Sequence, residues 1–356
     1  MSNDVFFLGA GFSIALANLC ITNDKKYPSL ATLTKEILNE NLGESLNVCL
    51  SKIPSKHKEN IELLLTYLST DAPWQEPQII HQNKALYFEI ISRMAAYFNN
   101  LGLECSYNFE PLKAFSRYII DSKSPIITLN YDTLLEKLLF SSMSKEYQKA
   151  NTYRGFYKQP IVDLFSRVSH RSAGIFGKPD YDFNGDKLPP IYKLHGSINW
   201  LWLKTNQSDP VYCATGREHK TLRKVLSKYI IPPVLDKSEF YNHNIIKSIW
   251  SDAYSALNKA ERIFIIGFSF PITDLSIKSL FNSAVDNANS KANIYVINTA
   301  DSVTSQSTNY IKNRYDDIFS KMCIDYTYCC DNSLEKFVKE FIELELNTKN
   351  DGRQKN

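Results

Sequence analysis

The sequence predicts an α/β fold, a doubly wound parallel sheet that carries one helical insertion and one loop-rich insertion. Three observations lead to this prediction. Short runs of almost continuous apolar character recur along the chain, as expected for parallel strands that are covered on both faces. Stretches with the spacing of amphipathic helices separate these runs. Glycine or polar residues follow the runs directly, and strands that alternate with helices in this way form open parallel sheets.

The apolar runs give the positions of the expected strands. These strands are residues 5–8, 126–129, 191–194, 229–231, 263–266 and 294–297. Helical spacing is clearest at residues 132–140, 245–259 and 276–289. We expect all six strands to join one parallel sheet.

Two long segments exceed what a minimal doubly wound domain needs. The first is mostly helical, and we expect it to form a helical insertion over about 29–121, with helices near 29–40, 58–69, 84–100 and 111–121. The second is polar, aromatic-rich and glycine-containing, and predicts a loop-rich insertion over about 141–190, near the rim of an active site. One domain is expected over residues 1–345, ending in an amphipathic helix near 334–344. The polar residues 346–356 are expected to form a disordered tail.

Composition excludes several classes of protein. Hydrophobic residues make up 44% and charged residues 22% of the 356 positions, which is the mix of a globular protein and not of a disordered or fibrous one. The net charge of +3 gives no direct indication of nucleic-acid binding. No apolar run reaches the ~20 residues of a membrane helix, and the first residues do not resemble a signal peptide. The seven cysteines include no C-x-x-C pair, so we expect a reduced, cytoplasmic protein without a metal site.

A glycine turn, Gly9-Ala10-Gly11-Phe12-Ser13, follows the first expected strand. Glycines allow backbone N–H groups to approach a phosphate, the start of the next helix adds positive potential, and the Ser13 hydroxyl is a further donor. The usual dinucleotide-binding turn has a third glycine where this chain has Ile14. A tight strand–helix turn that binds no ligand explains the same residues.

Two more motifs follow the strands at 126–129 and 191–194. In the first, Asn130 offers an amide donor and acceptor suited to a ribose hydroxyl, a carboxamide or a water. Asp132 stands where a helix should begin, and a helix N-cap is its simplest explanation. In the second, His195 is the side chain best suited to proton transfer near neutral pH. A structural histidine bonded to a loop is the alternative.

The last two motifs repeat the pattern of a strand followed by polar residues. Gly267 and Ser269 follow the strand at 263–266, with Asp274 further on, and Asn298 ends the strand at 294–297. Singly, each motif is explained equally well as a turn. Together they all lie at the carboxyl ends of expected parallel strands, on one edge of one sheet. This is the edge at which a Rossmann-like fold binds a nucleotide.

These five motifs, in this order, resemble the sirtuin-like domain. They read Gly-Ala-Gly-x-Ser, Thr-x-Asn-Tyr-Asp, Lys-Leu-His-Gly-Ser, Gly-Phe-Ser with a following Asp, and Ile-Asn, and they extend from Gly9 to Asn298. The chain is most similar to the bacterial branch found in antiphage defence systems. The deacetylase branch has a Gly-x-Pro-Asp-Phe-Arg segment where this chain reads Lys26-Tyr27-Pro28-Ser29-Leu30, and it has four zinc-binding cysteines in two C-x-x-C pairs, which this chain lacks.

The resemblance implies an NAD+ site and a role for each motif residue. Gly9, Ala10, Gly11 and Ser13 would hold the phosphates, and Asn130 and Asp132 would lie on the nicotinamide-ribose side. His195 would be the catalytic histidine. Gly267, Ser269 and Asn298 would line the adenosine end. The catalytic residues would thus be Asn130 and His195, with NAD+ as a substrate and no metal.

Three functions are compatible with this site. The leading hypothesis is an NAD+ glycohydrolase (NADase) that releases nicotinamide and ADP-ribose, as an NAD+-depleting effector of antiphage defence by abortive infection. In it, Asn130 would position the ribose and the attacking water, and His195 would be the general base. The alternatives are an NAD-dependent protein deacylase and a non-catalytic module that binds NAD+ or ADP-ribose within a larger complex. The pairing of Asn130 with His195 argues against the non-catalytic module, which needs no base.

Unrestrained NAD+ hydrolysis would kill the host cell, so an enzyme of this type must be inactive until it is triggered. Both insertions interrupt the sheet between motifs and can therefore lie beside the nucleotide cleft. We expect activity to depend on homo-oligomerisation or on a regulatory partner protein that repositions these segments. Insertions that merely complete the core are the alternative. No membrane partner and no direct nucleic-acid partner are predicted.

Overall fold

The structure is a computed structural model of the whole chain. It describes residues 3–20, 27–28, 30–39, 43–104, 110–150, 153–163, 188–203, 206, 208–214, 226–271, 274–285, 292–299, 306–320 and 322–354. Of the predicted loop-rich insertion over about 141–190, residues 141–150, 153–163 and 188–190 are described. Residues 164–187 lie outside the described residues.

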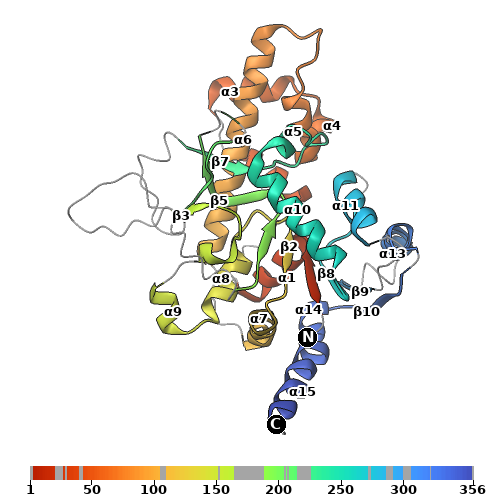
Figure 1. Cartoon of the computed structure of the whole chain (residues 1–356). Helices are drawn as coiled ribbons and strands as arrows, with labels where there is room; N and C mark the ends of the chain where they lie inside the picture. Colours follow the sequence, from red (N-terminus) through yellow and green to blue (C-terminus); the bar gives the residue numbers. More distant parts are fainter. Residues whose placement is uncertain are drawn as a thin grey trace, which may run out of the picture.

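A six-stranded parallel sheet forms the centre of the fold, with the strand order β10-β9-β8-β1-β2-β4 (Figure 1). Its strands are β1 (Asp4–Leu8), β2 (Ile126–Thr128), β4 (Ile191–Lys193), β8 (Arg262–Ile266), β9 (Asn293–Asn298) and β10 (Ile324–Cys329). Every residue of the central strand β1 is buried, because helices cover both of its faces. The predicted α/β class with a doubly wound parallel sheet is confirmed.

The helices that flank this sheet form two groups. One consists of α10 (Asn244–Asn258), α11 (Leu275–Val285) and α13 (Gln306–Ile318). The other consists of α1 (Ala10–Cys20), α7 (Glu110–Ser122), α8 (Leu134–Ser141), and the chain end with α14 (Ser333–Phe337), η5 (Val338–Ile342) and α15 (Glu343–Gln354). Aromatic rings join the layers: Phe6 on β1 packs on Phe115 of α7 and on Phe264 of β8.

The segment between α1 and β2 is helical, as predicted. Its elements are α2 (Leu30–Asn39), α3 (Glu44–Lys52), α4 (Ser55–Lys58), α5 (Ile61–Ser69), the long α6 (Pro77–Glu104) and α7. The first five pack on one another, and α3, α4 and α5 lie around the upper part of α6 in Figure 1. The last, α7, instead belongs to the helical cover of the sheet, where Phe115 and Tyr118 contact Phe6. Among the described residues, no helix is both long enough and apolar enough to cross a membrane.

A second, smaller sheet was not predicted. It has the order β3-β6-β5-β7, with β3 (Val162–Asp163), β5 (Gly196–Trp202), β6 (Tyr212–Cys213) and β7 (Ser227–Ile230). The expectation that residues 229–231 form a parallel strand of the main sheet is therefore wrong, because β7 pairs antiparallel with β5. Gly196 causes this difference. Its φ of 74° turns the chain from β4 into β5, and a Cβ there would lie 2.3 Å from the Tyr229 carbonyl oxygen.

The place of the sixth strand in the main sheet is taken by β10, an edge strand. Beyond it the chain stays helical to Gln354, whereas the prediction had a disordered tail from residue 346. A charged cluster at the amino edge of the sheet anchors the start of α15. Arg262 donates to both carboxylate oxygens of Asp4, at 2.7 and 2.9 Å, and to Glu345 Oε1 at 2.7 Å. The Tyr118 hydroxyl donates to the same Asp4 carboxylate.

Candidate active site at the carboxyl edge of the sheet

The order of the strands reverses between β1 and β8. From β1 the chain builds β2 and β4 on one side, and then returns to β8, β9 and β10 on the other side. Segments that follow strands on either side of such a reversal form the ligand-binding crevice of open α/β sheets. The predicted site residues lie at the end of these strands or after them: Gly9, Ala10, Gly11, Ser13, Asn130, Asp132, His195, Gly267, Ser269 and Asn298.

The glycines at this edge are required by the close contact of two turns. Gly267 has a φ of 64°, and its carbonyl oxygen accepts a hydrogen bond from the Gly11 N–H at 2.9 Å. A Cβ on Gly9 would lie 2.5 Å from that oxygen, and one on Gly11 would lie 2.7 Å from the Gly267 Cα. The turns after β1 and β8 therefore interlock through their backbones. This contact explains the three glycines whether or not a phosphate is bound.

Ser13 and Asn130 are joined in a network that connects the ends of β1 and β2. The Asn130 side-chain amide donates to the Gly9 carbonyl oxygen at 2.8 Å and to Ser13 Oγ at 2.9 Å. Ser13 in turn donates to Asp132 Oδ2 at 2.7 Å, and Tyr27 donates to the same oxygen. Ser13, predicted to bind a phosphate, and Asn130, predicted to bind the ribose, thus already form hydrogen bonds within the protein. A bound ligand must either replace these hydrogen bonds with its own or form additional ones with the same groups.

Asp132 combines a structural role with its place in this network. Its Oδ1 accepts from the N–H of Leu134, the first residue of α8, at 2.9 Å, whereas the N-cap position itself is occupied by Thr133, one residue later than expected. Its backbone carbonyl oxygen accepts from the Lys193 ammonium group. Lys193 also pairs with Glu136 at 2.9 Å, and both side chains are only 1% exposed. A buried ion pair therefore fixes the turn after β2 against β4.

His195 lies two residues after the end of β4, the strand that pairs with β2, and its side chain is 6% exposed. Its ring stacks against that of Tyr131 with centroids 6.3 Å apart, and its carbonyl oxygen accepts from Ile231 at 2.8 Å. Burial, together with the charge of Lys237, lowers the pKa of His195 to about 4, and Asp274 acts in the opposite direction. The imidazole is therefore neutral near pH 7. Its Nε2 is buried and has no hydrogen-bond partner among the described residues.

Lys237 and Asp274 form an ion pair near this histidine, with 2.7 Å between Lys237 Nζ and Asp274 Oδ1. The sequence motif after β8 included Asp274 but gave no partner for it. Lys237 follows β7, and no local pattern marks it as a site residue. Tyr27 was likewise missed, because its contact with Asp132 joins positions 105 residues apart.

The turn after β8 is held from two neighbouring elements. Asn298, at the end of β9, donates through its side-chain amide to the Phe268 carbonyl oxygen at 3.2 Å, and Tyr315 of α13 donates to the same oxygen at 2.6 Å. Arg314 donates to the Ser269 carbonyl oxygen at 3.1 Å. Ser269 is half-buried. Asn298 thus shapes the predicted adenosine end of the site through this turn.

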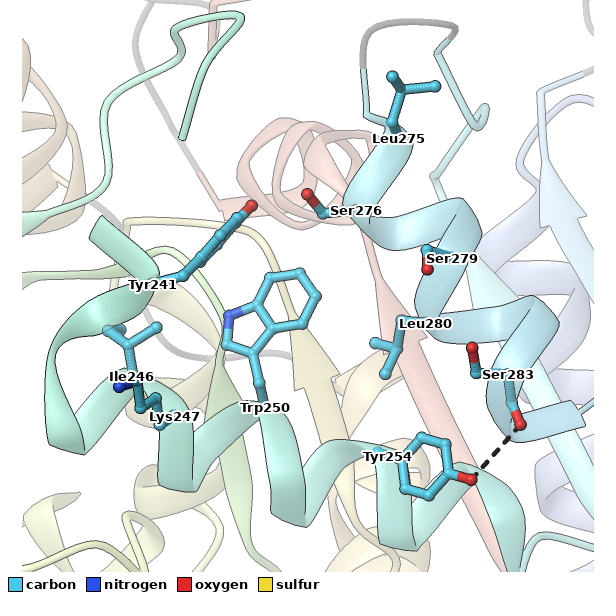
Figure 2. A pocket seen from close by; sticks show the side chains of 10 residues that line it. All are labelled: Tyr241, Ile246, Lys247, Trp250, Tyr254, Leu275, Ser276, Ser279, Leu280 and Ser283. Atoms are coloured by element: carbon cyan, nitrogen blue, oxygen red, sulfur yellow. Dashed lines mark hydrogen bonds between the residues drawn. The ribbon is translucent and has the colours of Figure 1, made fainter. Parts of the chain in front are cut away.

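An open groove of about 660 Å³ lies between α10 and α11 (Figure 2). Tyr241, Trp250 and Tyr254 line one side of it, and the serines of α11 line the other. The Trp250 indole N–H donates at 3.1 Å to the carbonyl oxygen of Leu194, the residue before His195. Trp250 thereby connects the groove to the histidine backbone.

Comparison with known proteins gives the family. The model of the SIR2-like domain matches residues 124–319, more than half of the chain. The chain belongs to the SIR2-like domain family. The match contains Asn130, Asp132, His195 and the turn after β8, and it begins after the glycine turn of β1. None of the curated proteins compared with the chain matches it.

Three solved structures are similar to this SIR2-like chain at low identity. Sir2Tm bound to a propionylated peptide has 10% identity, with 96% of this chain and 92% of that chain covered and a TM-score of 0.40. A structure that addresses sirtuin substrate affinity has 10% identity, coverage of 96% and 93%, and a TM-score of 0.41. A Sir2 complex with a p53 peptide and NAD+ has 11% identity, coverage of 96% and 92%, and a TM-score of 0.37.

Within the described residues of this SIR2-like chain, no three His, Cys, Asp or Glu side chains gather closely enough to hold a metal ion. No disulfide bond joins Cys49, Cys213, Cys323, Cys329 or Cys330. The site is accordingly built from hydroxyl, amide, imidazole and carboxylate groups that the backbone and one another hold in place.

Proposed function

We propose that this SIR2-like chain is an NAD+ glycohydrolase that splits the bond between nicotinamide and ribose to give nicotinamide and ADP-ribose. The proposal is based on the positions of Asn130 and His195 at the ends of two adjacent strands. They follow β2 and β4, adjacent strands of the sheet, and the buried Nε2 of the neutral His195 has no partner among the described residues. Membership of the family supports NAD+ as the substrate.

The reaction needs a base and a group that orients the ribose. Nicotinamide leaves with the electron pair of the glycosidic bond, and positive charge develops at the ribose carbon. A water oxygen bonds to this carbon, and the proton that the water loses would pass to His195 Nε2 and then to solvent. Such general-base assistance typically contributes about 10²–10⁴-fold. The Asn130 amide would hold a ribose hydroxyl or the water once it gives up its bond to Ser13.

The remaining predicted residues would bind the rest of NAD+. The first turn of α1 begins at the exposed Ala10 and contains no acidic residue, so the positive end of this helix would face the phosphates. The N–H groups of Gly11 and Phe12 already donate to the carbonyl oxygens of Gly267 and Gly9. Ser13 and Asp132 would complete the phosphate and ribose contacts. Gly267, Ser269 and Asn298 would line the adenosine end through the turn after β8.

The direct test is release of nicotinamide from NAD+ by the purified chain and by two variants, His195→Ala and Asn130→Ala. His81→Ala is the matched control, because His81 is exposed on α6, away from the carboxyl edge. Both site variants should lose the activity while keeping the far-UV circular dichroism of the wild type. Undiminished nicotinamide release by folded His195→Ala would refute the proposal.

A second arm of the experiment separates hydrolysis from protein deacylation, since both reactions release nicotinamide. An acetylated peptide is added, and the products are separated by chromatography. A glycohydrolase gives ADP-ribose at the same rate with and without the peptide. Nicotinamide release that requires the peptide, together with O-acetyl-ADP-ribose as the product, would assign a deacylase instead.

For the cell, we propose depletion of NAD+ as an effector of antiphage defence. Bacteria that express the wild-type chain should lose NAD+ after phage infection, and those that express His195→Ala should not. Equal NAD+ levels and equal phage yields in the two strains would contradict this role.

We propose further that the chain is held inactive until it self-associates or binds a partner protein. The helices α2 to α6 are the candidate surface, because α6 also packs against β5, the strand that follows His195. NAD+ hydrolysis per molecule should then rise with protein concentration over the range in which light scattering detects oligomers. Full activity of a dilute monomer would contradict this control.

A further inference from the structure

Tyr131 stands between two predicted site residues in the turn after β2 but has no part in the reaction described above. Its backbone is fixed to the segment that follows His195. The Tyr131 carbonyl oxygen accepts from the Ile198 N–H at 2.9 Å and from the Ser197 hydroxyl at 3.2 Å. These two hydrogen bonds hold the turn after β2 against the start of β5.

The Tyr131 side chain is joined to His195 in two ways. Its ring stacks on the imidazole, with 6.3 Å between the centroids and 27° between the planes, within the range in which aromatic rings attract each other. Its hydroxyl donates to the Ile231 carbonyl oxygen at 2.7 Å, and the Ile231 N–H donates to the His195 carbonyl oxygen at 2.8 Å. The same tyrosine thus contacts the ring of the proposed base and, through one residue, holds its backbone.

Stacking is important here because no hydrogen bond holds the reactive nitrogen of the imidazole. A histidine that acts as a base is ordinarily oriented by a hydrogen bond at one of its ring nitrogens. His195 Nε2 is buried and has no hydrogen-bond partner among the described residues. The ring of Tyr131 therefore limits how far the imidazole can rotate about its side-chain bonds.

A ring from the helical insertion supports Tyr131. Phe98 of α6 is 8% exposed, and its ring centroid lies 6.3 Å from that of Tyr131 and 5.6 Å from that of Tyr27. Tyr27 in turn donates to the Asp132 carboxylate. One phenylalanine of the insertion thus contacts both the tyrosine beside His195 and the tyrosine that holds Asp132.

Tyr131 is itself poorly suited to be the acid or base of the reaction. Its hydroxyl already donates to the Ile231 carbonyl oxygen. Burial raises the pKa of Tyr131 well above its ordinary value, so this phenol stays neutral near pH 7. A fixed orientation of His195, in contrast, contributes directly to catalysis, because a reacting group must be held in the geometry of attack.

We propose that Tyr131 is a positioning residue that holds the His195 imidazole in one orientation, and that Phe98 supports Tyr131 from the helical insertion. Insofar as it concerns NAD+ cleavage, this inference rests on the proposed function. Its claim about the orientation of the imidazole stands independently of any substrate. Phe98 also gives the helices α2 to α6, proposed above as a regulatory surface, a direct contact with the site.

Kinetics of nicotinamide release separate the ring of Tyr131 from its hydroxyl. Tyr131→Leu removes the stacked ring, so kcat should fall by about 10²-fold, the effect of a misplaced catalytic group, while KM for NAD+ stays nearly unchanged. Tyr131→Phe keeps the ring and loses one hydrogen bond, so kcat should fall by less than about tenfold. Phe98→Leu leaves Tyr131 in place without its support, and its kcat should lie between those of the wild type and Tyr131→Leu.

A measurement without NAD+ reports the orientation of the imidazole directly. NMR of the full chain, labelled with ¹³C and ¹⁵N at its six histidines, follows the His195 ring signals, which are assigned by their loss in His195→Ala. Spectra are recorded near pH 8, at which a histidine of ordinary pKa is already neutral. The ring current of Tyr131 shifts the His195 signals from those of a free imidazole. They should move toward the free values in Tyr131→Leu, and partly so in Phe98→Leu, but not in Tyr131→Phe.

Phe337→Leu is the matched control for the loss of a buried aromatic ring. Phe337 of α14 is 0% exposed and packs on Phe264 of β8 and Tyr328 of β10. Both strands lie on the other side of β1 from β4, the strand that precedes His195. By urea denaturation this variant should lose at least as much stability as Phe98→Leu, and it should keep the wild-type His195 signals and kcat.

The NMR signals decide the proposal. Signals of His195 in Tyr131→Leu and Phe98→Leu that coincide with those of Phe337→Leu would overturn it. Signals in Tyr131→Phe that move as far as those in Tyr131→Leu would also overturn it, because the stacked ring would then not hold the imidazole. If Tyr131→Leu fails to fold, the comparison of Phe98→Leu with Phe337→Leu decides in the same way.

The two measurements together separate this inference from the proposed function. If the His195 signals move as expected but no form of the chain cleaves NAD+, the proposed function fails and the positioning of the imidazole by Tyr131 stands. If NAD+ is cleaved and kcat of folded Tyr131→Leu equals that of the wild type, Tyr131 has only a structural role and the proposal is overturned.

Discussion

The Asn130 amide nitrogen lies 2.9 Å from Ser13 Oγ, although 117 positions separate the two residues. The register of the sheet brings them together, because Leu8 and Thr128 are paired at the carboxyl ends of β1 and β2. Thr128 reinforces the contact: its hydroxyl donates to the Leu8 carbonyl oxygen at 3.0 Å and accepts from the Asn130 N–H at 3.1 Å. The orientation of the proposed ribose-binding amide is therefore set by strand pairing and by a threonine at the end of a strand.

The contact between the turns after β1 and β8 predicts a strong dependence of stability on Gly267. Gly267→Ala should lower the free energy of unfolding by about 3 kcal/mol, because the residue has a positive φ and its Cβ would lie 2.2 Å from the Phe12 nitrogen. Gly43→Ala is the matched control. Gly43 also has a positive φ but no atom within 4 Å of the added Cβ, so Gly43→Ala should lose less, about 1–2 kcal/mol from backbone strain alone. Urea denaturation measures both, and equal losses would show that the turns do not interlock.

The buried ion pair below Asp132 predicts a second stability difference. Lys193→Met leaves Glu136 buried without its cation and should cost about 3–5 kcal/mol. Lys84→Met breaks the pair with Asp71, in which the side chains are 43% and 52% exposed, and should cost less than about 1 kcal/mol. Thermal unfolding of the two variants gives the comparison. If Lys193→Met unfolds like Lys84→Met, the buried pair does not hold the turn after β2.

The scattered cysteines predict independence from zinc. Elemental analysis of the purified chain should find far less than one zinc per molecule. Treatment with a chelator should leave the unfolding midpoint and any NAD+ cleavage unchanged, because a structural zinc site needs four grouped ligands. About one tightly bound zinc per chain, with loss of structure on its removal, would contradict this expectation.

The strands that cross the centre of the sheet could be predicted because burial on both faces makes their sequences almost continuously apolar. The edge strand β10 was missed because most of its residues are partly exposed and polar ones alternate with aromatic ones. The run at 229–231 was assigned to the wrong sheet, since local hydrophobicity does not report the direction in which a strand pairs. The direction of pairing depends on the turn at Gly196, which brings β5 against β7. This close approach to the Tyr229 carbonyl oxygen exists only in the folded chain.

The motifs at strand ends could be predicted to lie together at the proposed site, because the carboxyl ends of parallel strands meet at one edge of a sheet. The contacts of these residues could not be obtained in the same way. Asn298 holds the Phe268 carbonyl, and Tyr27 holds Asp132, through pairings that only the folded chain creates. Lys237 carries no local signal at all, since a lysine in a loop after a strand is ordinarily exposed.

The low pKa of His195 predicts a specific dependence of stability on pH. In the unfolded chain this imidazole takes up a proton near pH 6.5, whereas in the folded chain it does so only near pH 4. Between these values the unfolded state binds more protons, so the free energy of unfolding falls as the pH is lowered from 7 to 4. The contribution of His195 to that fall is on the order of 3 kcal/mol. His195→Asn removes it, so this variant should lose less stability over this range than the wild type, as measured by urea denaturation at successive pH values. His81→Asn, at an exposed position, should follow the wild-type curve. If the curves of His195→Asn and the wild type run parallel, His195 protonates equally in both states and cannot be the buried neutral base of the proposed reaction.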